Sequence, residues 1–147
     1  MTFPILIGVL TLTFSLILQS LAATAVVELS AAATHRGYAG RSTWHNVIMV
    51  EVITLVFLLA AFAQTLLWTM VLLQFTDLKD FETALYFSAS SFTTVGYGDV
   101  VLTGKWRILG PLEAANGLFS FGISTAMMFA IVYRMIEMRV QRLKSGK

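Results

Sequence analysis

The chain contains no cysteine and few charged residues for its length. Without cysteine it can form no disulfide framework and no thiolate metal site, and it has no cysteine nucleophile. Charged residues make up only 12% of the 147 residues, whereas 57% are hydrophobic. A typical soluble domain is about a quarter charged and about half apolar. We also find no paired carboxylates, metal-ligand spacing or phosphate-binding loop, so the sequence predicts that the protein is not an enzyme.

Basic residues are scarce as well, and the formal net charge is only +2. The one basic cluster is the short tail Arg134–Lys147. Nucleic-acid-binding proteins carry a basic patch or stripe over a whole face, and the sequence shows none. We therefore expect no nucleic-acid partner.

Three apolar runs are long enough to cross a bilayer, which takes about 20 residues of helix. They are Phe3–Val27, Val47–Phe75 and Ile108–Val132. A shorter apolar segment, Phe81–Phe92, lies between the last two. As a helix it would be about 18 Å long, roughly half a membrane. The pattern predicts an all-α membrane protein with three transmembrane helices and a short segment that re-enters the membrane or lies on its surface.

The first apolar run could be mistaken for a cleaved signal peptide, because Leu21-Ala22-Ala23 resembles a small-residue cleavage site. However, no Lys or Arg precedes the run, and it is long for the apolar part of a signal peptide. We expect it to be retained as a membrane span.

The basic residues around the apolar runs are distributed unevenly. Two lie between the first and second runs and five follow the third, against three between the second and third. The positive-inside rule therefore places the first connection and the C-terminus in the cytoplasm and the N-terminus outside. We expect an integral protein of the bacterial plasma (inner) membrane. The three groups are Arg36 and Arg41; Arg134, Arg139, Arg142, Lys144 and Lys147; and Lys79, Lys105 and Arg107.

One motif between the short segment and the third run carries a specific chemistry. Thr94–Gly98 reads TVGYG, the sequence of a potassium selectivity filter. A dehydrated K⁺ needs oxygen ligands in place of its water, and backbone carbonyls provide them without fixed negative charge. Gly96 and Gly98 can adopt the positive φ that such a backbone requires. We expect K⁺ to be coordinated by Thr94, Val95, Gly96 and Tyr97, with no other cofactor.

One copy of this loop cannot surround an ion, so the motif predicts a homotetramer around a central pore. The short segment would then be a re-entrant pore helix, capped at its start by Asp77 or Asp80 and followed by the filter loop. Thr93 and Asp99 flank and support the filter. Two alternatives stay open: a less selective cation channel, and a non-conducting membrane subunit that regulates another channel or transporter.

The region Val47–Val132 resembles the pore module of the potassium channel family, and the whole is similar to bacterial two-helix channels with one extra N-terminal span. Together with the apolar runs and the basic residues described above, the resemblance divides the chain into three parts. Residues 1–46 hold the N-terminal span and a cytoplasmic loop, and residues 134–147 form a short basic cytoplasmic tail. Residues 47–133 form the pore module, in which the outer helix is followed by a pore helix (81–92), a filter (94–98) and an inner helix (108–132).

The resemblance also implies roles for single residues. In Ala84–Ser88 the pair Tyr86 and Phe87 packs around the filter, and in Gly117–Gly122 the first glycine is a candidate gating hinge, with close helix packing as the alternative. The sequence departs from the family pattern at Leu102, where a proline is frequent. It also departs at Ser90, behind the filter, where some relatives carry a carboxylate.

The third apolar run contributes further candidates. Leu118, Phe121, Thr125 and Phe129 recur on one helical face, which the resemblance directs toward the pore. Phe129, or Tyr133 one turn later, could close the pore by dewetting. Glu113 lies within the run, where an ionisable residue is a functional candidate by default. It could brace the filter or pair with a residue on a neighbouring helix, and the alternative is that it simply reaches the membrane interface.

The lipid bilayer is the remaining expected partner. Anionic lipid could contact the basic tail. No basic residue lies between Arg41 and Lys79, and no run carries Lys or Arg at every third position. A voltage sensor needs several such charges, so we expect no intrinsic voltage sensor.

Overall fold

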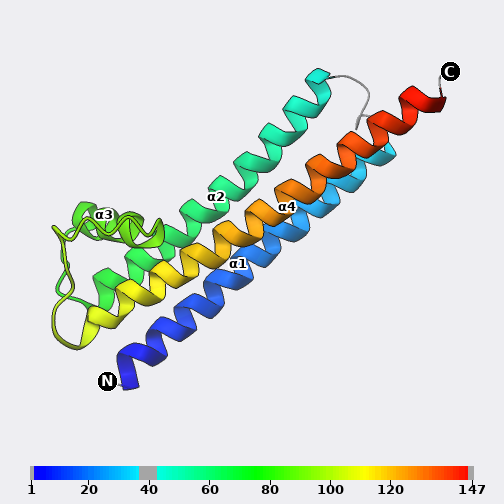
Figure 1. The fold of residues 1–147 in the computed structure, drawn as a ribbon. Coiled ribbons are helices and arrows are strands. Elements are labelled where there is room, and N and C mark those ends of the chain that lie inside the picture. Colours follow the sequence, from blue (N-terminus) through cyan, green and yellow to red (C-terminus); the bar gives the residue numbers. More distant parts are fainter. Residues whose placement is uncertain (1, 37–42, 146–147) are drawn as a thin grey trace. The chain divides into compact units, whose positions relative to one another are not determined.

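The computed structural model describes residues 2–36 and 43–145, and the regular structure in these ranges is helical (Figure 1). Three of the described helices are long and apolar enough to cross a membrane, which confirms the all-α expectation with three membrane-length helices. Arg41 and Lys147, two of the basic residues behind the expected orientation, lie outside the described ranges. The elements are α1 (Thr2–His35), α2 (Thr43–Phe75), α3 (Phe81–Phe92), the 3-10 helix η1 (Gly104–Ile108) and α4 (Leu109–Ser145).

Helices α1 and α4 continue well beyond the apolar runs that predicted them. Past Val27, α1 runs on through an alanine-rich stretch, and past Val132, α4 runs on through Arg, Met, Glu, Gln, Leu and Lys. Most of these are strong helix formers, and neither residues 28–35 nor residues 133–145 include a proline or glycine. The basic tail expected after residue 133 is therefore helical as far as Ser145.

The short helix α3 has the bounds expected from the sequence. Its N-cap is Asp80, one of the two candidates, whose Oδ2 accepts a hydrogen bond from the Thr83 backbone N–H at 2.9 Å. This bond lowers the pKa of Asp80, because the N–H groups at a helix start favour the ionised carboxylate. The cap fixes where α3 begins.

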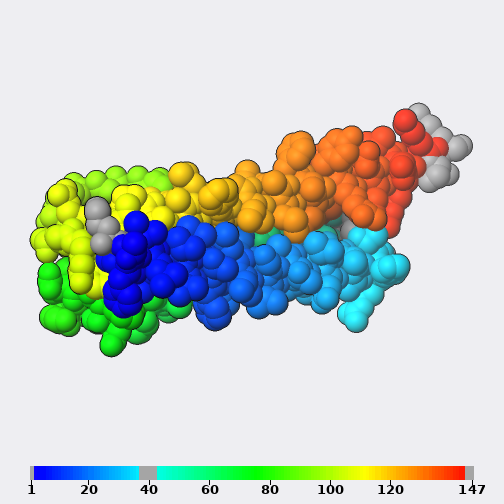
Figure 2. Space-filling view, turned by 90° about the horizontal axis from the view of Figure 1, so that it is seen from below, coloured from blue at the N-terminus to red at the C-terminus, as the bar shows by residue number. Residues whose placement is uncertain are grey.

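The chain divides into two units, and the long helices α1, α2 and α4 each contribute to both. The first unit consists of residues 2–19 and 60–121, and so contains α3 and the connection to α4. Figure 2 shows the beginning of α1, in blue, lying against the yellow residues near the start of α4. Gly8 allows this approach, since a Cβ there would run into the side chain of Leu112 and would lie 3.1 Å from a methyl group of Leu109. The apolar core of this unit is formed by Trp68, Leu72, Phe87, Phe92, Leu102 and Leu109.

The second unit consists of the described residues among 20–59 and 122–147. Its core is smaller and centres on Val26, Ile53 and Phe57. Ala22 and Ala23 of α1 pack against this core, as do Met127 and Met128 of α4. Small and unbranched side chains at these positions let the helices pack closely.

A cluster of buried polar side chains joins three helices inside the first unit. Gln64 of α2 is fully buried, and its Oε1 accepts from Ser15 of α1 and Ser120 of α4, each at 2.8 Å. Its Nε2 donates to Gln19 Oε1 at 2.9 Å. Asn116 of α4 donates to Ser15 Oγ at 2.7 Å. Since buried polar groups must find partners, this polar cluster specifies how α1 packs on the other two helices.

Replacing Gln64 by Leu should destabilise the protein, because Ser15 and Ser120 lose a shared acceptor while the side-chain volume hardly changes. We expect a loss of about 1–2 kcal/mol, the upper part of the range measured for interhelical hydrogen bonds in membranes. The measurement is thermal unfolding of the detergent-solubilised protein. Gln74→Leu is the matched control, because Gln74 lies exposed on the same helix. Equal unfolding temperatures for the two variants would contradict the role given to the cluster.

Candidate functional site

The TVGYG segment, residues Thr94–Gly98, folds back along the C-terminal turn of α3, and its first four N–H groups donate to residues of that turn. Thr94 N donates to the Ser91 carbonyl at 2.9 Å. The N–H groups of Val95 and Gly96 donate to the Ser90 carbonyl at 3.0 and 3.1 Å. Tyr97 N donates to the Ser90 hydroxyl at 3.3 Å. The end of a helix leaves its last carbonyls without intrahelical partners, and the TVGYG segment uses them.

The carbonyl groups of the TVGYG segment are used differently. Within the described ranges, no hydrogen bond has a carbonyl oxygen of residues 94–98 as its acceptor. All five residues are exposed. The structure therefore offers a row of free backbone oxygens on an exposed stretch of chain, and the N–H side of the same stretch is anchored.

The backbone angles explain this arrangement. Gly96 and Gly98 have φ of 57° and 79°, the positive values expected of them, and Thr94 has φ of 62°. Among the other described residues, only one glycine has a positive φ. The sign of φ therefore alternates between positive and negative from Thr94 to Gly98. Alternating left- and right-handed residues gather successive N–H groups on one side of the chain and the carbonyls on the other.

The positive φ of Thr94 was not anticipated from the sequence. A β-branched residue rarely adopts it, and the conformation costs about 1–2 kcal/mol. Such strain persists only where the surroundings enforce it, and it gathers at functional sites. Here the Thr94 N–H is held by Ser91, and the preceding residue Thr93 is held by its own hydroxyl, which donates to the Ala89 carbonyl at 2.6 Å.

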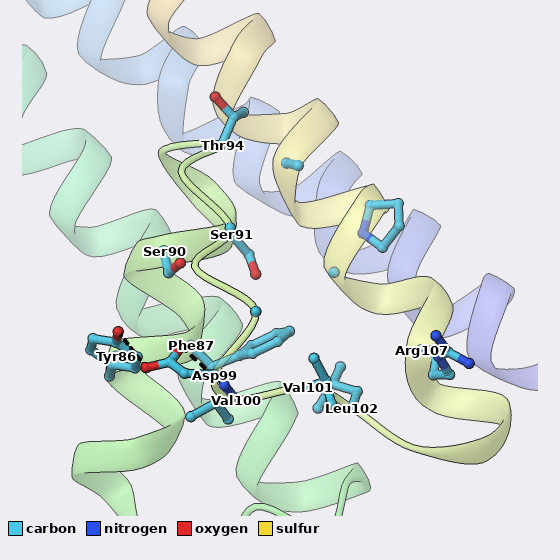
Figure 3. Close-up of a pocket in the computed structure, with 15 residues that line it drawn as sticks. Tyr86, Phe87, Ser90, Ser91, Thr94, Asp99, Val100, Val101, Leu102 and Arg107 are labelled. Carbon is cyan, nitrogen blue, oxygen red and sulfur yellow. Dashed lines mark hydrogen bonds between the residues drawn. The ribbon is translucent and has the colours of Figure 1, made fainter.

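At the other end of the segment, Asp99 is tied to Tyr86 in the middle of α3 (Figure 3). The Tyr86 hydroxyl donates to Asp99 Oδ2 at 2.7 Å, and the Tyr86 and Tyr97 rings stack with centroids 6.0 Å apart. The hydrogen bond lowers the pKa of Asp99 because it favours the carboxylate, and it raises the pKa of Tyr86 because it holds the phenolic proton. Asp99 Oδ1 also accepts from the Val100 N–H at 3.0 Å.

A groove of about 400 Å³ separates the TVGYG segment from the start of α4 (Figure 3). Its walls come from α3, from the segment itself and from the first turns of α4, and Arg107 lies among them. Val95 of the segment is 53% exposed in the single chain. The side of α3 that carries the TVGYG segment, its front, is thus open, whereas the opposite side, its back, is buried.

The back of α3 packs into the first unit. Phe87 belongs to the apolar core, whereas the neighbouring Ser88 is fully buried and polar. The Ser88 hydroxyl lies 2.9 Å from the Thr65 carbonyl of α2 and also hydrogen-bonds to Glu113 Oε1 of α4. Glu113 therefore reaches α3, as its candidate role requires, but through Ser88. Neither Ser88 nor Thr65 has a role predicted from the sequence; the available signal was a serine among the apolar residues of the short segment.

Leu102, the position at which the sequence departs from the family pattern, lies in the apolar core beside Leu109 and Phe87. A leucine there buries a somewhat larger apolar side chain in the core than a proline would, which gives the departure a structural reason. Ser90, the other departure, is the residue that accepts three N–H groups of the TVGYG segment. Ser90 thus holds the segment directly, whereas Leu102 contributes to the core of the first unit.

Gly117 of α4 lies against the end of α3. A Cβ at this position would run into the carbonyl group of Phe92, so the absence of a side chain is what lets the two helices approach. The α4 helix is continuous through this point. In the close-packing alternative for Gly117, the packing partner is thus Phe92 of α3.

The candidate pore-lining residues lie on the exposed surface of α4. Leu118 is 62% exposed, whereas Phe121 is less so and packs the edge of its ring on Phe92. In the second unit Phe129 is 71% exposed, and its ring stacks on that of Tyr133. Thr125 is exposed as well. These side chains have little intrachain packing, which leaves them free to face other subunits, lipid or a pore.

Comparison with known proteins places the chain among membrane channels. The model of a family described as "Ion channel" matches residues 47–134, more than half of the chain. The calcium-gated potassium channel TvoK of Thermoplasma volcanium is 31% identical over 70 residues, which is 47% of this chain and 19% of that protein. The chain therefore matches about a fifth of that relative's length. No solved structure gives a significant match.

Replacing Tyr86 by Phe removes the hydroxyl but keeps the ring that stacks on Tyr97. The pKa of Asp99 should rise toward 3.8, its ordinary value, because the bond that favours the carboxylate is lost. A carboxyl group whose pKa is lowered by folding stabilises the fold at pH values above its pKa in the unfolded chain. This stabilisation disappears as the pH falls through its pKa in the folded protein. The variant should therefore lose less stability on acidification. NMR titration of carboxyl-labelled Asp measures the shift, with Tyr133→Phe as control; an unchanged Asp99 titration would refute the coupling.

Replacing Gly117 by Ala should force α3 and α4 apart and reduce stability by about 1–3 kcal/mol, the usual effect of overpacking. Gly122→Ala is the matched control on the same helix, because a Cβ there has nothing within 4 Å. That variant should be neutral or more stable by up to about 1 kcal/mol, since alanine favours helix. Thermal unfolding compares the two. Altered channel gating with unchanged stability in Gly117→Ala would favour the hinge and contradict the packing role.

Proposed function

We propose, from the premise that the chain belongs to the ion-channel family matched over residues 47–134, that four copies of it form a potassium-selective channel. The observation that carries the proposal is the row of free carbonyl oxygens at Thr94, Val95, Gly96 and Tyr97, whose N–H groups are anchored on α3. In the proposal these oxygens replace the water around a K⁺ ion, and the Thr94 hydroxyl adds a further ring of oxygens. The segment is then the selectivity filter.

Four subunits are needed because one chain offers one row of oxygens. A cation requires ligands on all sides, and four filters around an axis provide them. The exposed apolar side chains support this assembly, since Val95 is 53% exposed within its own chain. Irregular backbone at membrane depth is tolerated only where it is buried in protein or lines water, and a tetramer provides both.

Helix α3 acts in the proposal as a re-entrant pore helix. It begins at the Asp80 cap and ends beside the filter, so its C-terminal partial negative charge points toward the inner mouth of the filter. This end favours a cation waiting in a central cavity. Gly117 brings α4, the proposed inner helix, against this end of α3.

The remaining parts of the proposal follow the orientation expected from the basic residues. The protein is integral to the membrane, with its N-terminus outside and its C-terminus in the cytoplasm of a bacterial cell. Leu118, Phe121 and Thr125 line the cavity below the filter, and Phe129 and Tyr133 form the gate. The basic end of α4 contacts anionic lipid. The proposal includes no catalysis and no intrinsic voltage sensor.

The similarity to a calcium-gated potassium channel supports the choice of K⁺. The calcium response of that relative is not carried over, because the match covers only 19% of its length. A nonselective channel and a non-conducting accessory subunit are the competing outcomes of the test below. Tyr97 argues against the nonselective channel, because its stacking on Tyr86 braces the filter.

The purified protein, fused into a planar bilayer with K⁺ on one side and Na⁺ on the other, should show a reversal potential that strongly favours K⁺. Gly96→Ala should abolish this preference, because each subunit takes on about 1–2 kcal/mol of backbone strain in the filter. Gly122→Ala is the control, with an unhindered Cβ, and should keep selectivity. Cross-linking should show a tetramer for all three proteins.

A reversal potential near zero with robust current would point to the nonselective channel. A tetramer that carries no current under any condition of pH or lipid would favour the accessory subunit. A monomer or dimer would exclude the fourfold filter.

A further inference from the structure

Three buried oxygen atoms lie in a row behind α3. They are the Thr65 carbonyl of α2, the Ser88 hydroxyl of α3 and Oε1 of Glu113 on α4. Ser88 and Glu113 are fully buried, and Thr65 nearly so. The Ser88 oxygen is in hydrogen-bonding contact with both of its neighbours. The three atoms thus link three helices through two contacts.

The number of protons available to these three oxygen atoms determines whether the Glu113 carboxyl group is protonated. Two oxygens attract at hydrogen-bonding distance only when a proton lies between them, so two contacts need two protons. A carbonyl carries no proton, and a serine hydroxyl carries one. If Ser88 donates to Thr65, the proton between Ser88 and Glu113 must come from the carboxyl group. An ionised carboxylate would leave one of the two contacts without any proton.

Among the described residues of the first unit, no cationic group pairs with Glu113. The parts of α1 and α2 in this unit, residues 2–19 and 60–75, contain no charged side chain. The other charged residues of the unit lie at the helix ends and connections, and none of them hydrogen-bonds or ion-pairs with Glu113 in the described structure. They are Asp77, Lys79, Asp80, Glu82, Asp99, Lys105 and Arg107.

The surroundings of the second carboxyl oxygen also favour a protonated Glu113. Glu113 Oε2 is buried with no hydrogen-bond partner, and so is Asn116 Oδ1, one turn further along α4. Two unpartnered buried acceptors are costly, and an unpartnered buried charge is far more so. A carboxylic acid avoids the larger of these costs.

We propose that Glu113 keeps its proton in the folded protein and donates it to Ser88, so that the relay Glu113 to Ser88 to Thr65 clamps α3 between α2 and α4. Ser88 and Ser90 are two residues apart on a helix, about 200° around its axis, and so lie on opposite faces. Ser90 holds the TVGYG segment on the front of α3, and the relay holds the back. Glu113 is thus a positioning residue for the filter, a role that rests on the proposed function.

The protonation itself is testable without any current. In detergent-solubilised protein with carboxyl-¹³C-labelled glutamate, one resonance at neutral pH should have the chemical shift of a protonated carboxyl. Glu113→Gln should remove that resonance, and Glu82→Gln, at an exposed site in the first turn of α3, should leave it. Five ionised glutamates in the wild-type protein would overturn the proposal.

A second variant keeps the test valid if Glu113→Gln fails to fold. Ser88→Ala removes the hydrogen-bond partner, so the same resonance should shift strongly; an unchanged resonance would refute the relay. The positioning role has its own readout in the planar bilayer. Glu113→Leu should lower K⁺ selectivity, and Glu113→Gln, which can still donate to Ser88, should restore part of it. Equal selectivity in wild type and Glu113→Leu would overturn the role, whereas absence of selectivity in all forms would overturn the proposed function instead.

Discussion

The carbonyl and hydroxyl oxygens of Ser90 accept the N–H groups of Val95, Gly96 and Tyr97, and the geometry of the site depends on these bonds. A backbone segment can turn all its carbonyls to one side only if its N–H groups find acceptors on the other. The end of a helix has such acceptors to spare. The strain at Thr94 is tolerated because the bonds on either side of it enforce the conformation.

Everything that fixes α3 therefore also fixes the segment that it carries. Asp80 sets where α3 begins, Phe87 anchors one side of it in the apolar core, and Ser88 links it to α2 and α4. Gly117 brings α4 directly against its last turn. A short helix of 12 residues has little stability of its own, so these contacts with long neighbours hold it in place.

Much of this arrangement could be predicted from residue types. The three long helices follow from apolar length, the bounds of α3 from a polar cap and an apolar run, and the positive φ of Gly96 and Gly98 from the motif. The family resemblance drawn from the same motif is confirmed by the family match. These features depend on local chemistry, which a single sequence shows directly.

Features that depend on contacts between residues far apart in the chain could not be predicted from the sequence. Ser15, Gln19 and Gln64 are polar residues in apolar runs, but nothing in their spacing shows that they meet one another. The positive φ of Thr94 is imposed by hydrogen bonds to α3 and contradicts the preference of threonine. The extent of α1 and α4 was underestimated because helix formers continue the helix where apolarity ends.

The polar cluster around Gln64 has a consequence for the order in which the chain is made. A ribosome delivers α1 and α2 to the membrane before α4, and lipid offers no partner to a side-chain amide. Between these two helices alone, the Gln64 oxygen already accepts from Ser15 and its nitrogen already donates to Gln19. In the pair formed by α1 and α2, the side-chain oxygen and nitrogen of Gln64 can thus both be hydrogen-bonded within the bilayer before α4 is inserted. When α4 arrives, Asn116 and Ser120 join a pair that is already assembled.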